Sequence, residues 1–480
     1  MQNKDIKIDS CRLFFRSITT RVPLKFGPEV TTSVLCARTQ ITVASAENTV
    51  SRKTGAKGWG ETPLSIAWVW PSQLGYEYRL SRLRKFCIAL RDAWNKCPYR
   101  GHPMEIGREF IRKDLTALWT NDNSGLAPGE EMPWLAALVC NSLFDIALHD
   151  AYGIYHQTSS WKIYTREFMN HDLSWYYTDE YKEMFKGKFP GDYLVPDNKI
   201  PPRIRVWHLV GAKDALDDTE LTGEEPDDGY PVKLRDWIHR DGLKCLKIKL
   251  TGIDSVWDYE RLKKTGLIAL ETKVEWLSTD FNCTVTDPAY VCDILDRLKA
   301  EEPEIYRMIL YVEQPFPYDI KSYPIDVRAV AARKPLFMDE SAHDWEHIKI
   351  GKDLGWTGVA LKTCKTITGA LLSLCWAKEA NLALMVQDLT NPMFAQIPHA
   401  GLGAHAGTIM GVESNGMQFY PQASAAEARI HPGLYTRRDG YLDLSTLGKE
   451  GFGCRAEEIF RADGISPDGP GKDWVSADFQ

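Results

Sequence analysis

Charged residues recur at the carboxyl ends of apolar segments in the middle of the chain. In chain order they are Lys249, Asp280, Glu313, Asp339 and Lys362, and neighbours in this series lie between 23 and 33 residues apart. That distance suits one strand, one helix and the turns that join them. In a parallel barrel the carboxyl ends of the strands meet on one face. The spacing therefore predicts three carboxylates that converge in one site and are flanked by lysines.

Three converging carboxylates repel one another at neutral pH, so they need a bound cation or one of them must be protonated. An all-oxygen ligand set favours a hard divalent ion, and we expect Mg²⁺. A lysine near such an ion, or beside a second lysine, has a lowered pKa and can act as a general base. Lys362, which would reach the site from the opposite side of the barrel to Lys249, could serve as a second acid or base.

A second lysine, Lys247, lies two residues before Lys249 within an apolar run. Side chains alternate across a strand, so both lysines point to the same face. Taken alone, this pair fits an edge strand with a solvated face as well as it fits proton chemistry. Each carboxylate taken alone fits a helix N-cap or a surface ion pair better than a ligand. It is the ordered set, with carboxylates at successive strand ends between lysines, that favours a functional site.

The elements that must position these residues follow from the alternation of strand-like and helical patterns after Pro231. The predicted strands are Cys245–Leu250, Trp276–Asp280, Ile309–Glu313, Pro335–Asp339, Gly358–Lys362, Ala383–Gln387 and Gly411–Phe419. Helices are expected between them, for example over Ala289–Glu301 and Thr368–Glu379, and Ile204–Val210 is a further strand. This order predicts a parallel sheet whose size suits a (β/α) barrel.

The first 155 or so residues predict an α+β module, in which strands over 34–43 and 58–62 precede the helices. The helices are expected over Tyr76–Trp94, Pro103–Trp119 and Pro133–Tyr155. Arg21–Gly27 is predicted to be a loop, because it contains Pro23 and ends in a glycine. The acidic stretch Asp217–Asp228 belongs to a less regular region, 157–230, and is expected to be a solvated loop or lid.

Length and composition bound the class of protein. The chain has 480 residues, 44% of them hydrophobic and 26% charged, which predicts two globular domains, one of them a large barrel. The net charge of −7 and the absence of a basic stripe argue against nucleic-acid binding. No apolar run approaches the roughly 20 residues that span a bilayer, so no membrane partner is expected. Eleven scattered cysteines without a Cys-x-x-Cys pair indicate a reducing cytoplasm.

With these residues identified, the chain resembles the enolase superfamily, in its mandelate racemase/muconate lactonizing enzyme branch. The motifs that carry the resemblance are Lys247-Ile248-Lys249, Asp280-Phe281-Asn282, Val312-Glu313-Gln314-Pro315, Asp339-Glu340-Ser341 and Leu361-Lys362-Thr363-Cys364-Lys365. Gly58-Trp59-Gly60-Glu61-Thr62 resembles the family's Gly-x-Gly-Glu turn. The tail His431–Gly453 resembles the strand that returns to the capping domain. Residues 157–230 match least well.

The resemblance implies an α/β protein in which an α+β capping domain covers a (β/α)₇β modified TIM barrel. The capping domain would span residues 1–160 and be completed by the tail at about 430–480. Residues 161–230 would form an insertion or lid and the first barrel strand, and 231–430 the barrel domain. A homo-oligomer is common in such families and is expected here.

The same resemblance implies that Asp280, Glu313 and Asp339 hold Mg²⁺, on which a substrate carboxylate binds. A base then removes the proton α to that carboxylate, and the metal stabilises the enediolate. Lys249 matches the base on the second strand, and Lys362 matches the acid/base of the muconate-lactonizing type on the sixth. Lys247 matches the lysine that helps to hold the substrate carboxylate and to lower the pKa of its neighbour.

Several questions stay open at the level of sequence. Asp339 and Glu340 are adjacent, so on a strand they face opposite ways and only one can be the third ligand; the motif favours Asp339. Further candidates for substrate contacts are Asn282, Asp388, Glu413 and Lys25. His399 and His405 are expected to be structural.

The fate of the enediolate is also open. We favour isomerase chemistry, as a racemase, epimerase or cycloisomerase, because two lysines permit proton transfer on both faces of the substrate. An acid-sugar dehydratase, which is a lyase on the same scaffold, is the first alternative. A barrel that binds a metal or a carboxylate without catalysis is the second.

Overall fold

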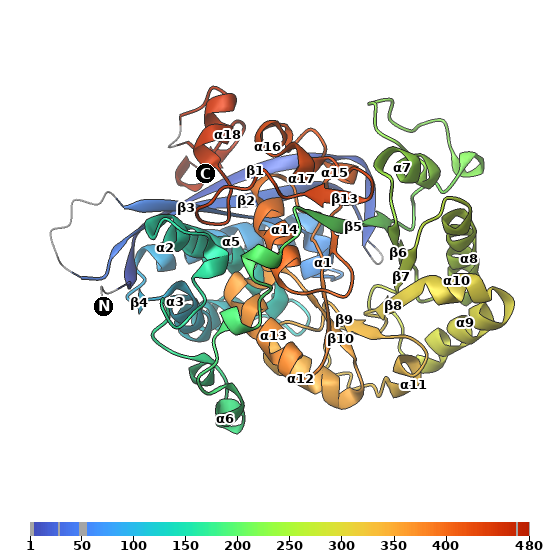
Figure 1. The fold of residues 1–480 in the computed structure, drawn as a ribbon, viewed down its shortest axis with the longest axis horizontal. Coiled ribbons are helices and arrows are strands. Elements are labelled where there is room, and N and C mark those ends of the chain that lie inside the picture. The colour runs from blue at the N-terminus through green and yellow to red at the C-terminus, as the bar shows by residue number, and fades with distance from the viewer. Residues whose placement is uncertain (1–3, 27–28, 48–54, 467–468, 480) are drawn as a thin grey trace.

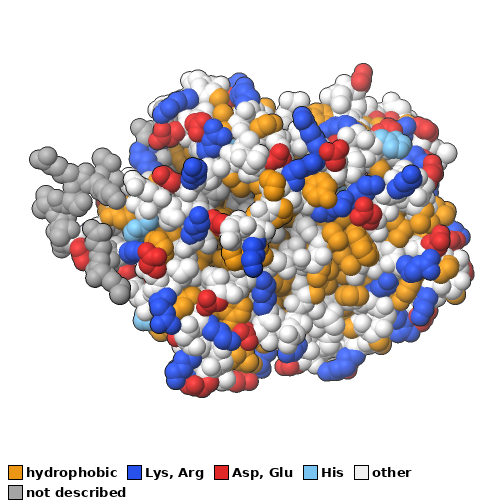
Figure 2. Space-filling view, in the orientation of Figure 1, with side chains coloured by type: hydrophobic (Ala, Val, Ile, Leu, Met, Phe, Trp, Pro, Cys, Tyr) orange, Lys and Arg blue, Asp and Glu red, His pale blue; other side chains and the backbone are white. Residues whose placement is uncertain are grey.

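The structure is a computed structural model that describes residues 4–26, 29–47, 55–466 and 469–479. The described residues form two sheets, one antiparallel and one mainly parallel, each accompanied by helices (Figure 1). Lysine, arginine and acidic side chains are interspersed over the face shown in Figure 2. Within the described ranges, no helix is both long enough and apolar enough to span a bilayer.

The antiparallel sheet is built from the two ends of the chain. Its strands run in the order β14-β1-β2-β3, and β4 pairs with β1. Their bounds are Ile6–Phe26 for β1, Glu29–Ser45 for β2, Ala56–Leu64 for β3, Arg100–Gly101 for β4 and Val475–Ser476 for β14. Strand β14 lies beside the middle of β1, where Phe14 is opposite Ser476. The C-terminal segment therefore completes a sheet that the N-terminus begins.

Helices pack against this sheet, and the predicted ones are all present. The helices of this part are α1 (Ile66–Val69), which was not predicted, α2 (Tyr76–Asn95), α3 (Pro103–Phe110), η1 (Ile111–Leu115), α4 (Thr116–Asn123) and α5 (Trp134–Tyr155). The last of these is buried along most of its length, which explains its almost continuous apolar sequence. Between it and the barrel, residues 160–199 form short helical turns rather than long elements.

The second sheet contains eight parallel strands in the order β11-β10-β9-β8-β7-β6-β5-β12, and they form a nearly closed barrel. Their bounds are Arg203–Val210 (β5), Cys245–Lys249 (β6), Trp276–Asp280 (β7), Ile309–Glu313 (β8), Leu336–Met338 (β9), Gly358–Leu361 (β10), Ala383–Val386 (β11) and Val412–Glu413 (β12). Neighbouring strand ends are in register, with Lys249 opposite Asp280 and Asp280 opposite Glu313. The predicted convergence of strand ends is thus a direct result of parallel pairing.

Helical segments connect each barrel strand to the next, which gives the predicted (β/α)₇β order. They are α7 (Leu234–Asp241), α8 (Ser255–Glu271), α9 (Pro288–Glu301) with α10 (Pro303–Met308), α11 (Arg328–Ala331), α12 (Trp345–Leu354), α13 (Ile367–Glu379) and α14 (Gln396–His405). Aspartates cap three of the helix starts, at Asp254, Asp287 and Asp344, through bonds to backbone N–H groups.

Three local predictions are wrong. Residues 21–26 of the predicted loop belong to β1, where Lys25 lies opposite Val30 of β2; Gly27 lies outside the described residues. Pro23 falls at an irregularity between Thr19 and Leu24, where a missing N–H does no harm to the ladder.

The predicted strand Gly411–Phe419 is only two residues long, because the chain turns at Ser414 and residues Gly416–Phe419 form helix α15. The strand within the tail His431–Gly453 is β13 (Tyr441–Asp443). It pairs with β5 of the barrel and not with the capping sheet, which β14 joins instead.

Candidate functional site

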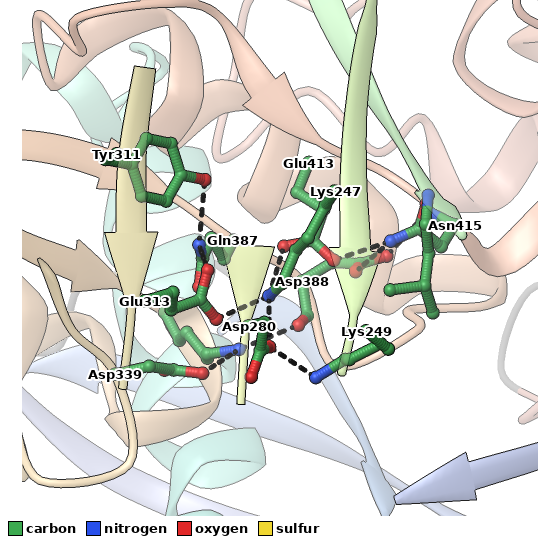
Figure 3. Close-up of polar contacts among 12 residues, drawn as sticks. Lys247, Lys249, Asp280, Tyr311, Glu313, Asp339, Gln387, Asp388, Glu413 and Asn415 are labelled. Carbon is green, nitrogen blue, oxygen red and sulfur yellow. Dashed lines mark hydrogen bonds and ion pairs between the residues drawn. The ribbon is translucent and has the colours of Figure 1, made fainter. Parts of the chain in front are cut away.

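The polar residues at the barrel strand ends come together as a buried cluster (Figure 3). Lys249, Asp280 and Glu313 end β6, β7 and β8, while Asp339 and Lys362 directly follow β9 and β10. None of these side chains belongs to a residue that is more than 5% exposed. So many charges persist in the interior only because each is paired with an opposite one.

Lys247 occupies the centre of the cluster. Its Nζ lies 2.5 Å from Glu313 Oε1, 3.2 Å from Asp280 Oδ2 and 3.2 Å from Glu413 Oε2. Figure 3 shows its ammonium group between these three side chains, which come from three different strands. The lysine that the sequence placed as an electrostatic neighbour is therefore the principal counter-charge of the carboxylates.

Lys249 points to the same side of β6 as Lys247, and like Lys247 it pairs with Asp280. Its Nζ lies 2.5 Å from Asp280 Oδ2 and donates to Asn282 Oδ1 at 3.0 Å. Asn282 also donates to the carbonyl of Leu250, the residue directly after β6, which holds its amide in place. The structure thus places Asn282, a predicted substrate contact, beside the candidate base Lys249.

Lys362 lies across the barrel from Lys249, because β10 is four positions from β6 in the eight-stranded order. Its Nζ is 3.0 Å from Asp339 Oδ2 and donates to the carbonyl of Asp388 at 3.0 Å. The indole ring of Trp68, from helix α1, covers this ammonium at 4.9 Å. The two candidate acid/base lysines therefore reach the cluster from opposite walls.

The adjacent acids Asp339 and Glu340 take different directions. Asp339 faces the cluster and pairs with Lys362, while Glu340 accepts a hydrogen bond from Trp68 Nε1 at 2.8 Å. Burial, and then the charge of Asp339, raise the pKa of Glu340 to about 7. The structure thus presents Asp339 to the interior and directs Glu340 toward the capping side.

The charges in the cluster shift one another's pKa values strongly. Burial alone would lower the pKa of Lys247, but Glu313 and the other carboxylates outweigh it and raise that pKa well above its ordinary value. The pKa of Lys362 is raised in the same way, with Asp339 outweighing burial. Burial raises the pKa of Glu313, whereas in Asp280 the effect of burial is exceeded by the two lysines of β6, which lower its pKa. The carboxylates by themselves keep Lys247 and Lys362 protonated.

Glu413 and Asp388, which were also predicted as substrate contacts, make different contacts in the structure. Glu413 reaches the cluster and also accepts a hydrogen bond from Asn415 at 2.7 Å. The carboxylate of Asp388 accepts hydrogen bonds from the backbone N–H groups of Asn391 and Asn415, so it braces the turn after β11. Among the described residues, Lys25 forms no hydrogen bond or ion pair with the cluster.

The histidines have structural contacts. His399 Nε2 lies 2.6 Å from the carbonyl of Glu413, behind strand β12. His405 bonds to the carbonyl of Gly401 in its own helix and to Asp197.

Three residues of the site were not predicted from the sequence. Lys365 donates to the carbonyl of Asp339, Gln387 donates to Glu313, and Trp68 covers Lys362. Gln387 carried a signal, since it ends a hydrophobic run as Asp280 and Glu313 do. Lys365 stood within a quoted motif, but its direction depends on the turn after β10. Nothing in the sequence near Trp68 indicated that it reaches the barrel.

The cluster is nearly closed. The cavity among these side chains has a volume of about 20 Å³, close to the space needed for one water molecule. Trp68 and Leu389 line it together with Lys247, Lys249 and Lys362. Binding of a small carboxylate therefore requires part of this lining to move.

The donor chemistry of the cluster fits a hard cation. Asp280, Glu313 and Asp339 supply carboxylate oxygens from successive strand ends, and two of them already share one positive charge, the ammonium of Lys247. Across the described ranges, no group of three histidine, cysteine, aspartate or glutamate side chains has the arrangement of a formed metal site. In the structure, lysine ammonium groups lie against the carboxylate oxygens that would otherwise bind a metal ion.

Comparisons with known proteins place the fold. No protein-family profile matches the chain, and no curated protein matches its sequence. Solved structures do match: N-succinyl Arg/Lys racemase from Bacillus cereus has a TM-score of 0.60 at 16% identity, over 93% of this chain and 95% of its own. A mandelate racemase/muconate lactonizing protein from Herpetosiphon aurantiacus has a TM-score of 0.59 at 16% identity, over 93% and 98%.

A third structure, an enolase from Bradyrhizobium complexed with magnesium and mandelic acid, has a TM-score of 0.59 at 16% identity. It matches over 100% of this chain and 98% of its own. At these identities the likeness concerns the fold, and it confirms the fold that the sequence predicted. The chain thus has the modified TIM barrel with a capping domain that is shared by mandelate racemase/muconate lactonizing enzyme-like structures of the enolase superfamily.

Proposed function

We propose that this protein is an Mg²⁺-dependent isomerase that removes the proton α to the carboxylate of a small molecule and returns a proton to the same intermediate. Racemisation or epimerisation is the reaction that we favour, with cycloisomerisation using the same residues. The observation that carries the proposal is the pair Lys249 and Lys362, buried on opposite walls of the barrel with a carboxylate cluster between them. Two bases on opposite sides of a substrate can serve both of its faces.

The carboxylates of Asp280, Glu313 and Asp339 would hold the metal. Mg²⁺ bound there would neutralise a substrate carboxylate and stabilise the negative charge of the enediolate. The remaining steps fall to the lysines. Lys249 takes the α-proton from one face, Lys362 delivers or takes a proton on the other, and Lys247 supports the carboxylate end of the substrate.

Charge balance supports a role for the cation. The cluster contains four carboxylates, of Asp280, Glu313, Asp339 and Glu413, and four lysines, namely Lys247, Lys249, Lys362 and Lys365. These charges compensate one another, and the carboxylates raise the pKa of Lys247 and of Lys362. Two further positive charges lower the pKa of nearby ammonium groups. A lysine can then lose its proton and act as a base.

Other features agree with the proposal. One similar structure carries the name of a racemase, and another is a complex with magnesium and mandelic acid, which is a small 2-hydroxy carboxylic acid. All eleven cysteines are free, as suits the reducing cytoplasm that we propose as its location. We further propose, from the family resemblance, that the protein forms a homo-oligomer.

The proposal can be tested by hydrogen exchange with solvent. The purified protein is incubated in D₂O with MgCl₂ and a set of small carboxylates, among them N-acylated amino acids and 2-hydroxy acids. We expect deuterium at the α-carbon of at least one compound and loss of this exchange when EDTA removes the metal. A product lighter by one water would instead establish a dehydratase. Tight binding without any exchange would favour a non-catalytic carboxylate-binding protein.

A further inference from the structure

The turn after β9 decides which of two adjacent acids faces the site. Asp339 Oδ2 lies 3.0 Å from Lys362 Nζ, inside the barrel mouth. Glu340, one residue later, is turned away and accepts the bond from Trp68. An adjacent pair of acids at a strand end has two ways to present a carboxylate, so something must fix the choice.

The backbone of Asp339 is fixed by side chains on both of its polar atoms. Its N–H donates to Gln314 Oε1 at 2.8 Å, and its carbonyl accepts from Lys365 Nζ at 2.5 Å. Because β9 ends at Met338, this carbonyl lies beyond the ladder and would lack a strand partner. The carbonyl also accepts from the backbone N–H of Ala342 at 3.0 Å, and the shorter bond from Lys365 adds a charged donor that holds the peptide in this orientation.

The same ammonium also reaches the side chain. Lys365 Nζ lies 3.4 Å from Asp339 Oδ1, on the other side of the carboxylate from Lys362. In the described part of the chain, every hydrogen bond and ion pair of Lys365 goes to Asp339. Lys365 is only 4% exposed, and Asp339 is the carboxylate that pairs directly with its charge.

We propose that Lys365 is a positioning residue, which fixes the peptide and the carboxylate of Asp339 so that Asp339, and not Glu340, is the third ligand of the cation. The inference rests on the proposed function, since it assumes that the cluster binds Mg²⁺. Loss of an outer partner of a metal ligand typically weakens metal binding about 10- to 100-fold. We expect a weakening of that size when Lys365 is removed.

The test is calorimetric titration of the full-length protein with Mg²⁺, which needs no substrate. Lys365→Met is the main variant, and Asp339→Asn shows the loss expected when the ligand itself is changed. Lys334→Met is the matched control. Lys334 lies just before β9, at the opposite end of that strand from Asp339, and its ammonium also donates to a backbone carbonyl, that of Ile309, at 2.8 Å. A purely structural effect of losing a lysine beside β9 would lower the free energy of unfolding in both lysine variants.

The inference predicts that Lys365→Met binds Mg²⁺ about 10- to 100-fold more weakly, whereas Lys334→Met and Glu340→Gln bind it as the wild type does. If Lys365→Met does not fold, Lys365→Ala replaces it and must show the same direction of change, because it also removes the bonds to the carbonyl and carboxylate of Asp339. Wild-type affinity in the Lys365 variant, or weakened binding in Glu340→Gln, would overturn the inference alone. A wild-type protein that binds no Mg²⁺, or binds it equally well with Asp339→Asn, would overturn the proposed function as well.

Discussion

At the scale of single residues, the site is a problem of compensating buried charge. Lys247 is a poor residue for a barrel interior, and it is stable there because three carboxylates lie within 3.2 Å of its ammonium. This compensation has a chemical consequence. The carboxylates that stabilise Lys247 and Lys362 also raise the pKa of both, and a bound cation that shares these carboxylates would lower it again.

A second buried charge cluster lies outside the proposed active site, in the capping sheet. Glu61 of β3 is 1% exposed and accepts a hydrogen bond from Arg38 Nε at 2.6 Å. Arg38 also pairs with Glu427 at 3.2 Å, and Arg16 lies near enough to act on both acids electrostatically. Burial raises the pKa of Glu61 to about 7, although Arg38 opposes the shift.

This pKa predicts a pH-dependent stability. The folded protein binds the Glu61 proton more tightly than the unfolded chain does, for which the ordinary pKa is 4.5. The free energy of unfolding should therefore fall as the pH rises from about 4.5 to about 7, by on the order of 3 kcal/mol at about 1.4 kcal/mol per pKa unit. Urea unfolding of wild type and Glu61→Gln between pH 5 and 8 measures this effect, and the variant should show the flatter profile.

The control for Glu61 is Glu457→Gln. Glu457 is an exposed acid that pairs with Arg461 on the surface, so its variant should follow the wild-type profile. Parallel pH profiles for wild type and Glu61→Gln would show that the Glu61 proton does not contribute.

At the scale of elements, the Gly-x-Gly-Glu motif is explained by the close packing of β3 on α5. A Cβ atom on Gly60 would lie 1.9 Å from the carbonyl oxygen of Leu143 and 2.7 Å from the backbone nitrogen of Ala147. A Cβ atom on Gly58 would lie 2.2 Å from the backbone nitrogen of Ala151. These neighbours are backbone atoms of a buried helix, which cannot move aside as a side chain can.

Gly60→Ala is therefore expected to lower the free energy of unfolding by about 3 kcal/mol, as for an overpacked core. Gly75→Ala is the matched control, because no atom lies within 4 Å of its added Cβ. Chemical denaturation of both variants tests this prediction. Equal stability of Gly60→Ala and the wild type would mean that β3 and α5 are less closely packed than the structure shows.

Elements with a strong periodic pattern were predictable from the sequence. Strands such as Trp276–Asp280 and Ile309–Glu313 have the expected bounds because each is a short apolar run that ends in an acid. Pairing between segments was less predictable. Residues 21–26 form a strand despite Pro23, because β2 supplies a partner that the local sequence does not reveal.

The same limit applies to the site. The charged residues at strand ends were identifiable, since their position in the series is a property of the sequence. Trp68 and the partners of Lys365 were not identifiable, because their contacts depend on how the capping elements and the turns after β9 and β10 are arranged. The roles of the residues in proton transfer stay predictions.

At the scale of the whole molecule, polar contacts join the capping elements to the barrel, and three of them are informative about the site and the acidic stretch. Asp145 of α5 accepts two hydrogen bonds from Thr368 at the start of α13, at 2.9 and 2.8 Å. Trp68 bonds to Glu340 beside the site.

The third contact joins Arg21 of β1 to the acidic stretch after β5. Arg21 pairs with both carboxylate oxygens of Asp228, at 2.7 and 2.8 Å. At its other end the stretch pairs with helix α8, through Asp217 and Lys264. The acidic stretch, predicted to be a solvated loop or lid, is thus held by basic residues of β1 and α8.

Among the residues of these contacts, Trp68 lines the cavity of about 20 Å³ at the site. Under the proposed function, a substrate that enters displaces part of the lining and lies between Lys249 and Lys362. The central claim is that these two lysines act on opposite faces of the α-carbon.

The most direct test of this claim is α-proton exchange in D₂O, followed by NMR, for each enantiomer of an active carboxylate. Lys249→Ala should slow exchange from one enantiomer by about 10²- to 10⁴-fold and spare the other, and Lys362→Ala should show the opposite preference. If both variants exchange both enantiomers at the wild-type rate, the assignment of the two lysines as opposed bases is wrong.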